Sequence, residues 1–208
     1  MFVRSLCVRI LMIVLAAPAV ALAAESWPTP PVRLIVPFAP GGSSDTAARV
    51  FSQKLSERLG QQIVVDNRSS AGGIVGADLL ARSPPDGYTL GLGNVSSQTG
   101  SPLIFSNVSY HPVKSFTYVA FIGTVPVVLI AHPSFPARSV ADLVKMAKAQ
   151  PGKIDYGTAG NGTIGHIVAE MFKLKTGINL THVPYRGSAF KFIDLGGNGI
   201  PIGFDALA

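Results

Sequence analysis

Two short segments rich in glycine and hydroxyl side chains could bind an anion. One is PFAPGGSSD at residues 37–45, and the other is GTAGNGTIGH at residues 157–166. Glycine lets the backbone approach a ligand closely, and the first N–H groups of a helix have no partner within that helix. With the helix dipole and nearby hydroxyl groups, such N–H groups suit a carboxylate or a phosphate. For one segment alone, a capped turn without a ligand is an equal alternative.

Nucleotide and metal chemistry have weaker support. Residues 160–165 match the dinucleotide fingerprint GxGxxG, which also needs an acidic side chain about 20 positions later to bind the ribose. No Asp or Glu occurs between Glu170 and Asp194. The four histidines show no close metal-ligand spacing, and neither a GxSxG elbow nor a phosphate loop is present. The sequence therefore predicts no cofactor and no bound metal.

A secreted hydrolase is the alternative from the enzyme class. Its nucleophile would be Ser44 or Ser188, and a Ser–His–Asp relay would combine Ser44 with His166 and Asp205. No sequence motif supports the close geometry that such a relay requires. The interpretation favoured by the residues is a binding protein without catalytic activity.

Strands and helices alternate along the chain in a way that would position both segments. Residues 32–37 form a continuous apolar run typical of a buried parallel strand, and a helix is expected over residues 46–59. The second segment likewise lies between an expected strand and an expected helix. Such an order predicts an α/β protein with mainly parallel sheets, in which ligands bind at the carboxyl ends of strands. Further strands are expected at 63–65, 88–93, 117–122, 125–131, 154–158, 180–183 and 200–205, and further helices at 74–81, 140–150, 164–176 and 189–195.

The N-terminal residues are typical of a secretory signal peptide. Arg4 and Arg9 precede an apolar run that ends in the small-x-small sequence of residues 21–23, so we expect cleavage after Ala23 and a periplasmic mature protein. The run is too short to span a membrane, which needs about 20 residues. Because Cys7 is lost with the signal, the mature chain has neither a disulfide nor a thiolate.

The mature chain is expected to form two lobes and to bind no nucleic acid. Its basic residues are scattered, with none of the clustering that nucleic-acid binding requires. No later segment is apolar for long enough to cross a membrane, so the mature protein is not membrane-embedded. We place the signal peptide at residues 1–23, lobe 1 at residues 24–124 and lobe 2 at residues 125–208, both lobes α/β.

Several ordered motifs resemble those of a known family. They are IVPFAPGGSSD at 35–45, DNR at 66–68 with AGG at 71–73, PDGYTL at 85–90, GTAGNG at 157–162, HVPYRG at 182–187 and FD at 204–205. Together they resemble the extracytoplasmic solute receptors of tripartite tricarboxylate transporters, also called Bug receptors, over residues 27–205.

This resemblance implies a two-lobed, flytrap-like periplasmic binding fold of type II. The implied ligands are small carboxylates, including di- and tricarboxylates, acidic amino acids and aromatic acids, which the receptor delivers to membrane permease subunits. The family continues past Asp205, so lobe 2 is expected to be truncated, and a remnant without function is the alternative.

The resemblance also implies that loops from both lobes surround the ligand. The expected ligand-binding residues of lobe 1 are Phe38, Gly41, Gly42, Ser43, Ser44, Asp45, Asn94 and Ser96. Those of lobe 2 are Thr158, Ala159, Gly160, Gly162, Thr163, His166, Tyr185, Gly187 and Asp205. Packing and strand-end capping are the alternatives for Tyr185 and Asp205.

Overall fold

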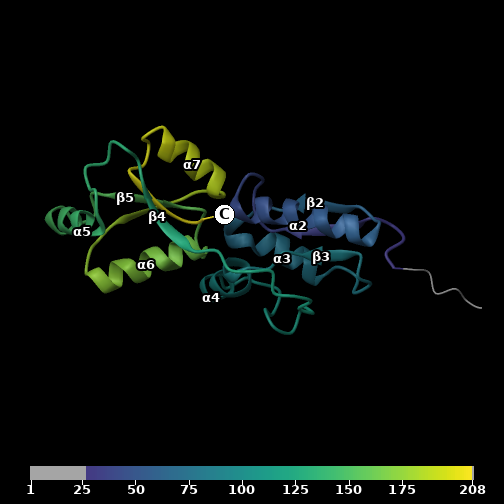
Figure 1. The fold of residues 1–208 in the computed structure, drawn as a ribbon. Coiled ribbons are helices and arrows are strands. Elements are labelled where there is room, and N and C mark those ends of the chain that lie inside the picture. The colour runs from purple at the N-terminus through teal and green to yellow at the C-terminus, as the bar shows by residue number, and fades with distance from the viewer. Residues whose placement is uncertain (1–26, 208) are drawn as a thin grey trace, which may run out of the picture.

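The computed structural model describes residues 27–207. The predicted signal peptide and its cleavage site lie outside these residues. Over the described range, none of the helices combines the length and the apolar character that a bilayer crossing demands. Two groups of strands and helices lie side by side along the molecule, and each group has its own sheet (Figure 1).

Lobe 1 contains a small parallel sheet. Its strands are β1 (Val32–Val36), β2 (Ile63–Asn67) and β3 (Thr89–Gly91), in the order β2-β1-β3. Alternate residues of the central strand β1 pack with Ala48 of helix α2 (Ser43–Leu59) to form the core of this lobe. Helix α3 (Ile74–Ala81) contacts β1 and β3. The sequence pattern predicted these elements with ends shifted by a few residues.

Lobe 2 contains a mixed sheet with the order β4-β7-β5-β6. Its strands are β4 (Val127–Ala131), β5 (Asp155–Thr158), β6 (Thr181–Pro184) and β7 (Ile202–Ala206). Strand β4 runs antiparallel to β7, whereas β5 is parallel to both of its neighbours. The accompanying helices are α5 (Val140–Ala149), α6 (Ile164–Thr176) and α7 (Ser188–Gly196).

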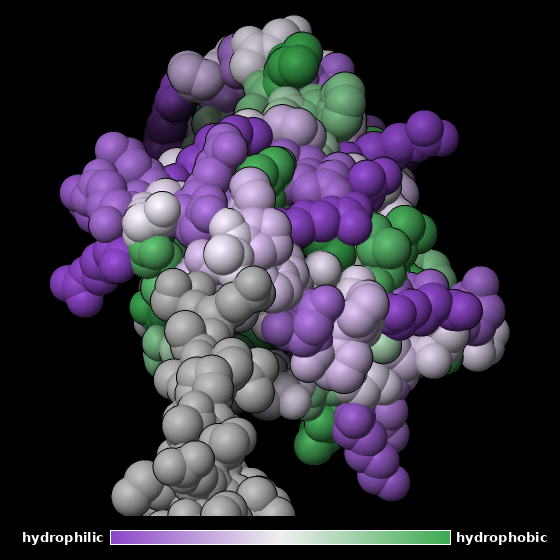
Figure 2. Space-filling model, turned by 90° about the vertical axis from the view of Figure 1, so that its right-hand side faces the viewer, coloured by the Kyte–Doolittle hydropathy of each residue, from purple (hydrophilic) through white to green (hydrophobic). Residues whose placement is uncertain are grey.

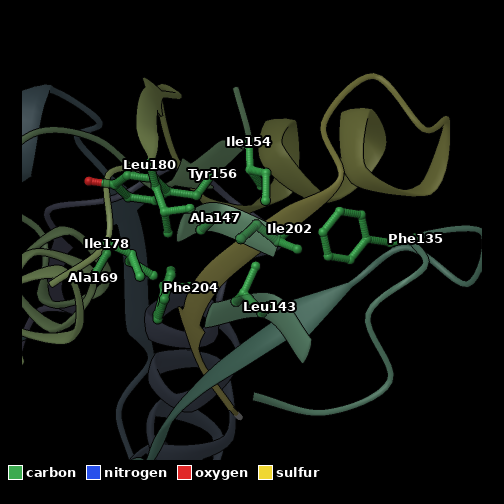
Figure 3. Packing of buried hydrophobic residues seen from close by; sticks show 10 residues of the cluster. All are labelled: Phe135, Leu143, Ala147, Ile154, Tyr156, Ala169, Ile178, Leu180, Ile202 and Phe204. Atoms are coloured by element: carbon green, nitrogen blue, oxygen red, sulfur yellow. The ribbon is translucent and has the colours of Figure 1, made fainter. Parts of the chain in front are cut away.

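The core of lobe 2 has more buried members than that of lobe 1 and joins the sheet to helices α5 and α6 (Figure 3). The rings of Tyr156 and Phe204 meet edge to face with centroids 5.8 Å apart. This arrangement fixes β5 against β7, and therefore fixes the loops that follow both strands. The buried members are Phe135, Leu143, Ala147, Ile154, Tyr156, Ala169, Ile178, Leu180, Ile202 and Phe204.

The segment between the two sheets contains little regular structure. A single π-helical turn, η2 (Ser96–Gly100), leads into the short helix α4 (Ser101–Ile104), and no strand or helix occurs from residue 105 to residue 126. The strand predicted at residues 117–122 is wrong. Within residues 27–207 no strand lies beside this segment to pair with its backbone, and Val119 and Phe121 remain 83% and 82% exposed. The predicted lobe boundary at residues 124/125 falls at the end of this segment and stays a prediction.

The outer face at the lobe 1 end is mixed in character. In Figure 2, hydrophobic patches on this face are separated by hydrophilic side chains and do not merge into one surface.

Candidate functional site at the junction of the lobes

The first glycine-rich loop connects β1 to α2 and is stabilised from within by Asp45. The carboxylate of Asp45 accepts hydrogen bonds from Gly41 N, Asn67 Nδ2 and Arg49 Nε, each 3.0 Å long. Burial alone would raise the pKa of Asp45, but these donors outweigh it and hold the pKa below its usual value. Asp45 is therefore the internal support of the loop.

The first turn of α2 has no side-chain cap. The residue before the helix is Gly42, which offers no side chain to cap the first turn, and Gly41 has a φ of +80° that favours glycine. Phe38, Ser43 and Ser44 are half-buried around this turn. Uncapped N–H groups and adjacent hydroxyl groups are the features that an anion needs.

Hydroxyl groups also hold the second loop, which connects β5 to α6, from within. Thr158 is fully buried, and its Oγ1 accepts a hydrogen bond from Gly160 N at 3.2 Å and lies 2.7 Å from His182 Nε2. Thr163 Oγ1 donates to Gly160 O at 2.7 Å. Gly160 and Gly162 have φ values of +133° and +75°, while Ala159 is half-buried. The two threonines thus shape a loop whose tight turns depend on glycine.

Three stacked rings lie next to this second loop. His182 is between Tyr156 and His166, with ring centroids 4.9 Å and 4.3 Å away respectively. His166 Nδ1 accepts a hydrogen bond from Gly162 N at 3.3 Å, so the stack reaches the loop backbone. Burial lowers the pKa of His166 and lowers that of His182 to about 4. His182 was not predicted as a site residue, although it belongs to the HVPYRG motif.

Lobe 1 reaches across the junction to the start of α6. Ser96 Oγ accepts a hydrogen bond from Ile164 N at 2.9 Å, so a side chain of one lobe caps a helix of the other. Asn94 lies beside it, accepting from Ser97 N at 3.0 Å and donating to Ser44 Oγ at 3.4 Å. The structure therefore places Asn94 beside the first glycine-rich loop and Ser96 beside the second; their role in ligand binding stays a prediction.

The loop that follows β6 closes the other side of the junction. A Cβ added to Gly187, whose φ is +128°, would lie 3.1 Å from Ala39 Cβ, and one added to Gly42 would lie 3.7 Å from Ser188 Cβ. Tyr185 donates its hydroxyl hydrogen bond to Asp194 within lobe 2. Burial, and then that hydrogen bond, raise the pKa of Tyr185 to about 12. The first loop is thus packed directly against the start of α7.

Asp205 forms a buried ion pair that sequence reasoning missed. It accepts a hydrogen bond from Lys191 Nζ, and its Oδ1 also accepts from Ala206 N at 2.7 Å. Lys191 lies on α7 and is fully buried. The only signal in the sequence was a lysine in the apolar context AFKFI.

The polar side chains of the junction have partners that do not form a hydrolytic relay. Ser44 bonds to Asn94, His166 to Gly162 and Asp205 to Lys191, so none of these bonds joins one relay member to another. A hollow of about 610 Å³ lies elsewhere, along residues 102–106 and 108–112. The arrangement suits recognition through backbone N–H and hydroxyl groups from two lobes.

Comparisons with known proteins identify the family of the chain. The family model described as "Tripartite tricarboxylate transporter family receptor" matches residues 47–206. A UPF0065 protein of Bordetella pertussis is 38% identical over 203 residues, which are 98% of this chain and 62% of that protein.

Two solved structures share the fold. The chain described as "R. palustris Rpa4515 with adipate" has a TM-score of 0.85 and 40% identity, covering 87% of this chain and 60% of that one. The periplasmic binding protein BugD has a TM-score of 0.82 and 33% identity, covering 86% and 60%. This chain thus spans about 60% of the length of the relatives that it matches. The α/β fold is that of periplasmic solute-binding proteins, and the chain belongs to the tripartite tricarboxylate transporter receptor family.

Proposed function

We propose that this protein is a periplasmic solute-binding receptor that captures a small carboxylate and passes it to the permease subunits of a tripartite tricarboxylate-type membrane transporter. Membership of the receptor family supports the proposal, as does the adipate named for one solved relative. The charge and apolar pattern of residues 1–23 supports export. We infer binding without catalysis, because the family is one of solute receptors.

One observation carries the proposal: two glycine-rich loops of different lobes open helices at the same junction. The loop after β1 leads into α2, and the loop after β5 leads into α6. A Cβ added to Gly42 would lie 3.7 Å from Ser188 Cβ, and Ser96 Oγ accepts a hydrogen bond from Ile164 N, which supports placing both loops where the lobes meet. A carboxylate held there would accept hydrogen bonds from both lobes at once and would draw the lobes together.

The binding free energy expected for a carboxylate held by both loops suits a transport receptor. Each hydrogen bond to a charged group contributes about 1.5–3 kcal/mol. Three or four of them, less the entropy cost of association, reach about −8 kcal/mol, which is roughly micromolar affinity. We assign ligand contact first to Gly42, Ser43 and Ser44, which form the start of α2, where no side chain caps the helix. Asp45, Thr158 and Thr163 support the loops from inside.

The test is isothermal titration calorimetry with adipate, succinate and citrate at low salt. We expect at least one of these acids to bind with roughly micromolar affinity. Replacing Gly42 with Leu should reduce that affinity at least tenfold, because the new side chain fills the space in front of Ser188. Ser43→Ala, which removes one hydroxyl, should weaken binding less.

Two results would count against the proposed site. Absence of binding heat for all three acids would remove the carboxylate assignment. Binding that is unchanged in both variants would show that the first loop is not the site.

A further inference from the structure

Helix α7 has an unusual arrangement of its side chains. Phe190, Phe192 and Ile193 are exposed, whereas Lys191 is fully buried. A lysine is almost never fully buried unless its ammonium group is paired. The fold has therefore placed a positive charge inside lobe 2 while leaving neighbouring apolar groups at the surface.

Two glycines make room for the stem of Lys191. Gly157 of β5 and Gly203 of β7 are register partners in the sheet. A Cβ added to Gly157 would lie 2.9 Å from Lys191 Cγ, and one added to Gly203 would lie 3.3 Å from Lys191 Cδ. The bare backbone of these two strands thus forms a groove along which the lysine stem runs.

At the end of this groove, the ammonium group reaches Asp205. Lys191 Nζ donates to the Asp205 carboxylate and lies 3.5 Å from Phe204 O. Burial lowers the pKa of Lys191, and the hydrogen bond from Lys191 to Asp205 opposes this shift. Both partners are shielded from water, so removing one of them would leave an uncompensated buried charge.

Asp205 lies beside the start of α6, the helix that the second glycine-rich loop opens. The Tyr185 ring lies over Gly157 together with the lysine stem, and a Cβ on Gly165, in the first turn of α6, would lie 2.6 Å from Phe204 O. Asp205 therefore lies at the carboxyl end of β7, between the first turn of α6 and α7. Without Lys191, its carboxylate would be a ready partner for an ammonium group.

We propose that Lys191 is a specificity-determining residue, which occupies Asp205 with an internal ammonium group and so restricts the ligand to carboxylates that carry no amino group. This inference rests on the proposed function and narrows its ligand class. An amino acid would have to displace a buried lysine that is already paired, or leave its own ammonium group without a partner. A di- or tricarboxylate without an amino group neither displaces Lys191 nor carries an unpaired ammonium group. The receptor should therefore bind such acids more tightly than acidic amino acids.

The experiment compares adipate with L-2-aminoadipate, which differ by one ammonium group. By calorimetry, the unmodified protein should bind adipate at least tenfold more tightly. Lys191→Ala frees both the charge of Asp205 and space beside it, so the affinity ratio should shift at least tenfold toward L-2-aminoadipate. Lys148→Ala removes an exposed lysine of α5 and should leave the ratio unchanged.

A second variant, Lys191→Gln, serves as the test if Lys191→Ala does not fold. Lys191→Gln keeps a hydrogen-bond donor for Asp205 but removes the positive charge, and it should shift the ratio in the same direction. Thermal melts by circular dichroism identify which variants are folded. A wild-type preference below tenfold would overturn the inference, and so would an unchanged ratio in the folded variants.

Failure of the proposed function gives a different pattern. Wild-type protein that binds neither acid counts against carboxylate capture. The inference is then decided by Lys191→Ala or Lys191→Gln: acquired binding of L-2-aminoadipate supports it, and continued absence of binding overturns it.

Discussion

The stack formed by Tyr156, His182 and His166 makes the stability of lobe 2 sensitive to low pH. The other charged groups near the rings are Glu170, which accepts from Tyr156 Oη at 2.6 Å, and Lys173, which pairs with Glu170 at 2.8 Å. Burial is the main reason that the pKa of His182 falls to about 4, compared with about 6.5 in an unfolded chain. The unfolded state therefore binds a proton at a higher pH than the folded state does.

We predict that stability declines as the pH falls from about 6.5 to about 4. A depressed histidine pKa stabilises the fold above the unfolded pKa of about 6.5, and this contribution is lost as the pH falls from that value through the folded pKa of about 4, because the unfolded state binds a proton that the folded state excludes. His182→Gln should remove roughly 1–3 kcal/mol of the pH-dependent change. The measurement is urea unfolding of both proteins at pH 7, 5.5 and 4.5. His111→Gln, at an exposed position, is the control. If the free energy of unfolding of His182→Gln fell with pH as steeply as that of the parent, the prediction would be contradicted.

Individual side chains of the site show where sequence reasoning reached its limit. The motifs predicted that both glycine-rich loops contribute to one site, which stays a prediction. Spacing alone could not reveal that the hydroxyl of Thr158 bonds within its own loop and contacts His182. Nor could spacing reveal that Lys191 points inward. That orientation depends on Gly157 and Gly203, which lie 34 residues before and 12 residues after Lys191 in the chain. Such partners are brought together only by the tertiary fold.

At the scale of elements, α6 lies very close to the end of β7. The close approach requires Gly165, since a Cβ there would lie 2.6 Å from the carbonyl oxygen of Phe204. This contact positions the second glycine-rich loop, which immediately precedes α6. Backbone atoms cannot move aside as a flexible side chain can.

We therefore predict that Gly165→Ala destabilises the protein by about 1–3 kcal/mol, the usual cost of overpacking. Gly196→Ala is the matched control, because a Cβ at that position of α7 has no atom within 4 Å. That substitution should be neutral or stabilise by up to about 1 kcal/mol. Chemical unfolding of both variants measures the difference. Equal stabilities would show that α6 can shift without cost.

Most elements were predictable because their signals are local. Apolar runs, capping residues and glycine stops specified the strands and helices on either side of the site loops. The direction of β4 and the absence of a strand at residues 117–122 were not predictable in this way, because pairing depends on which distant strand lies alongside. β4 has β7 as its antiparallel partner, whereas Phe121 lies in a segment that is left exposed.

At the scale of the whole molecule, the two lobes meet backbone to backbone. A Cβ on Gly100 would overlap the carbonyl oxygen of Gly162 and would lie 2.7 Å from Ile167 Cδ1. The hydrogen bond from Ile164 N to Ser96 Oγ crosses the same boundary. The spacing of the lobes is thus set by a few small residues.

We predict that Gly100→Ala forces the lobes apart and weakens carboxylate binding at the junction. Residues 24–208 contain no cysteine, so paired cysteines at Glu57 and Lys148 can carry spin labels on α2 and α5. Pulsed electron paramagnetic resonance should show a longer interlabel distance in Gly100→Ala than in the parent. Gly93→Ala is the control, because the three atoms nearest to the new Cβ all belong to the flexible Gln98 side chain. An unchanged distance distribution in Gly100→Ala would refute the prediction.

The groove beneath Lys191 has a consequence for how this chain and its relatives diverged. Because the lysine stem lies against Gly203, a larger residue at position 203 and a lysine at position 191 exclude each other. A substitution at only one of these positions is destabilising. A lysine at position 191 has no space beside a larger residue at 203, and a glycine at 203 without the lysine leaves a cavity. The two positions should therefore be inherited as a pair, so that relatives with a small residue at position 191 carry a bulky apolar residue at position 203.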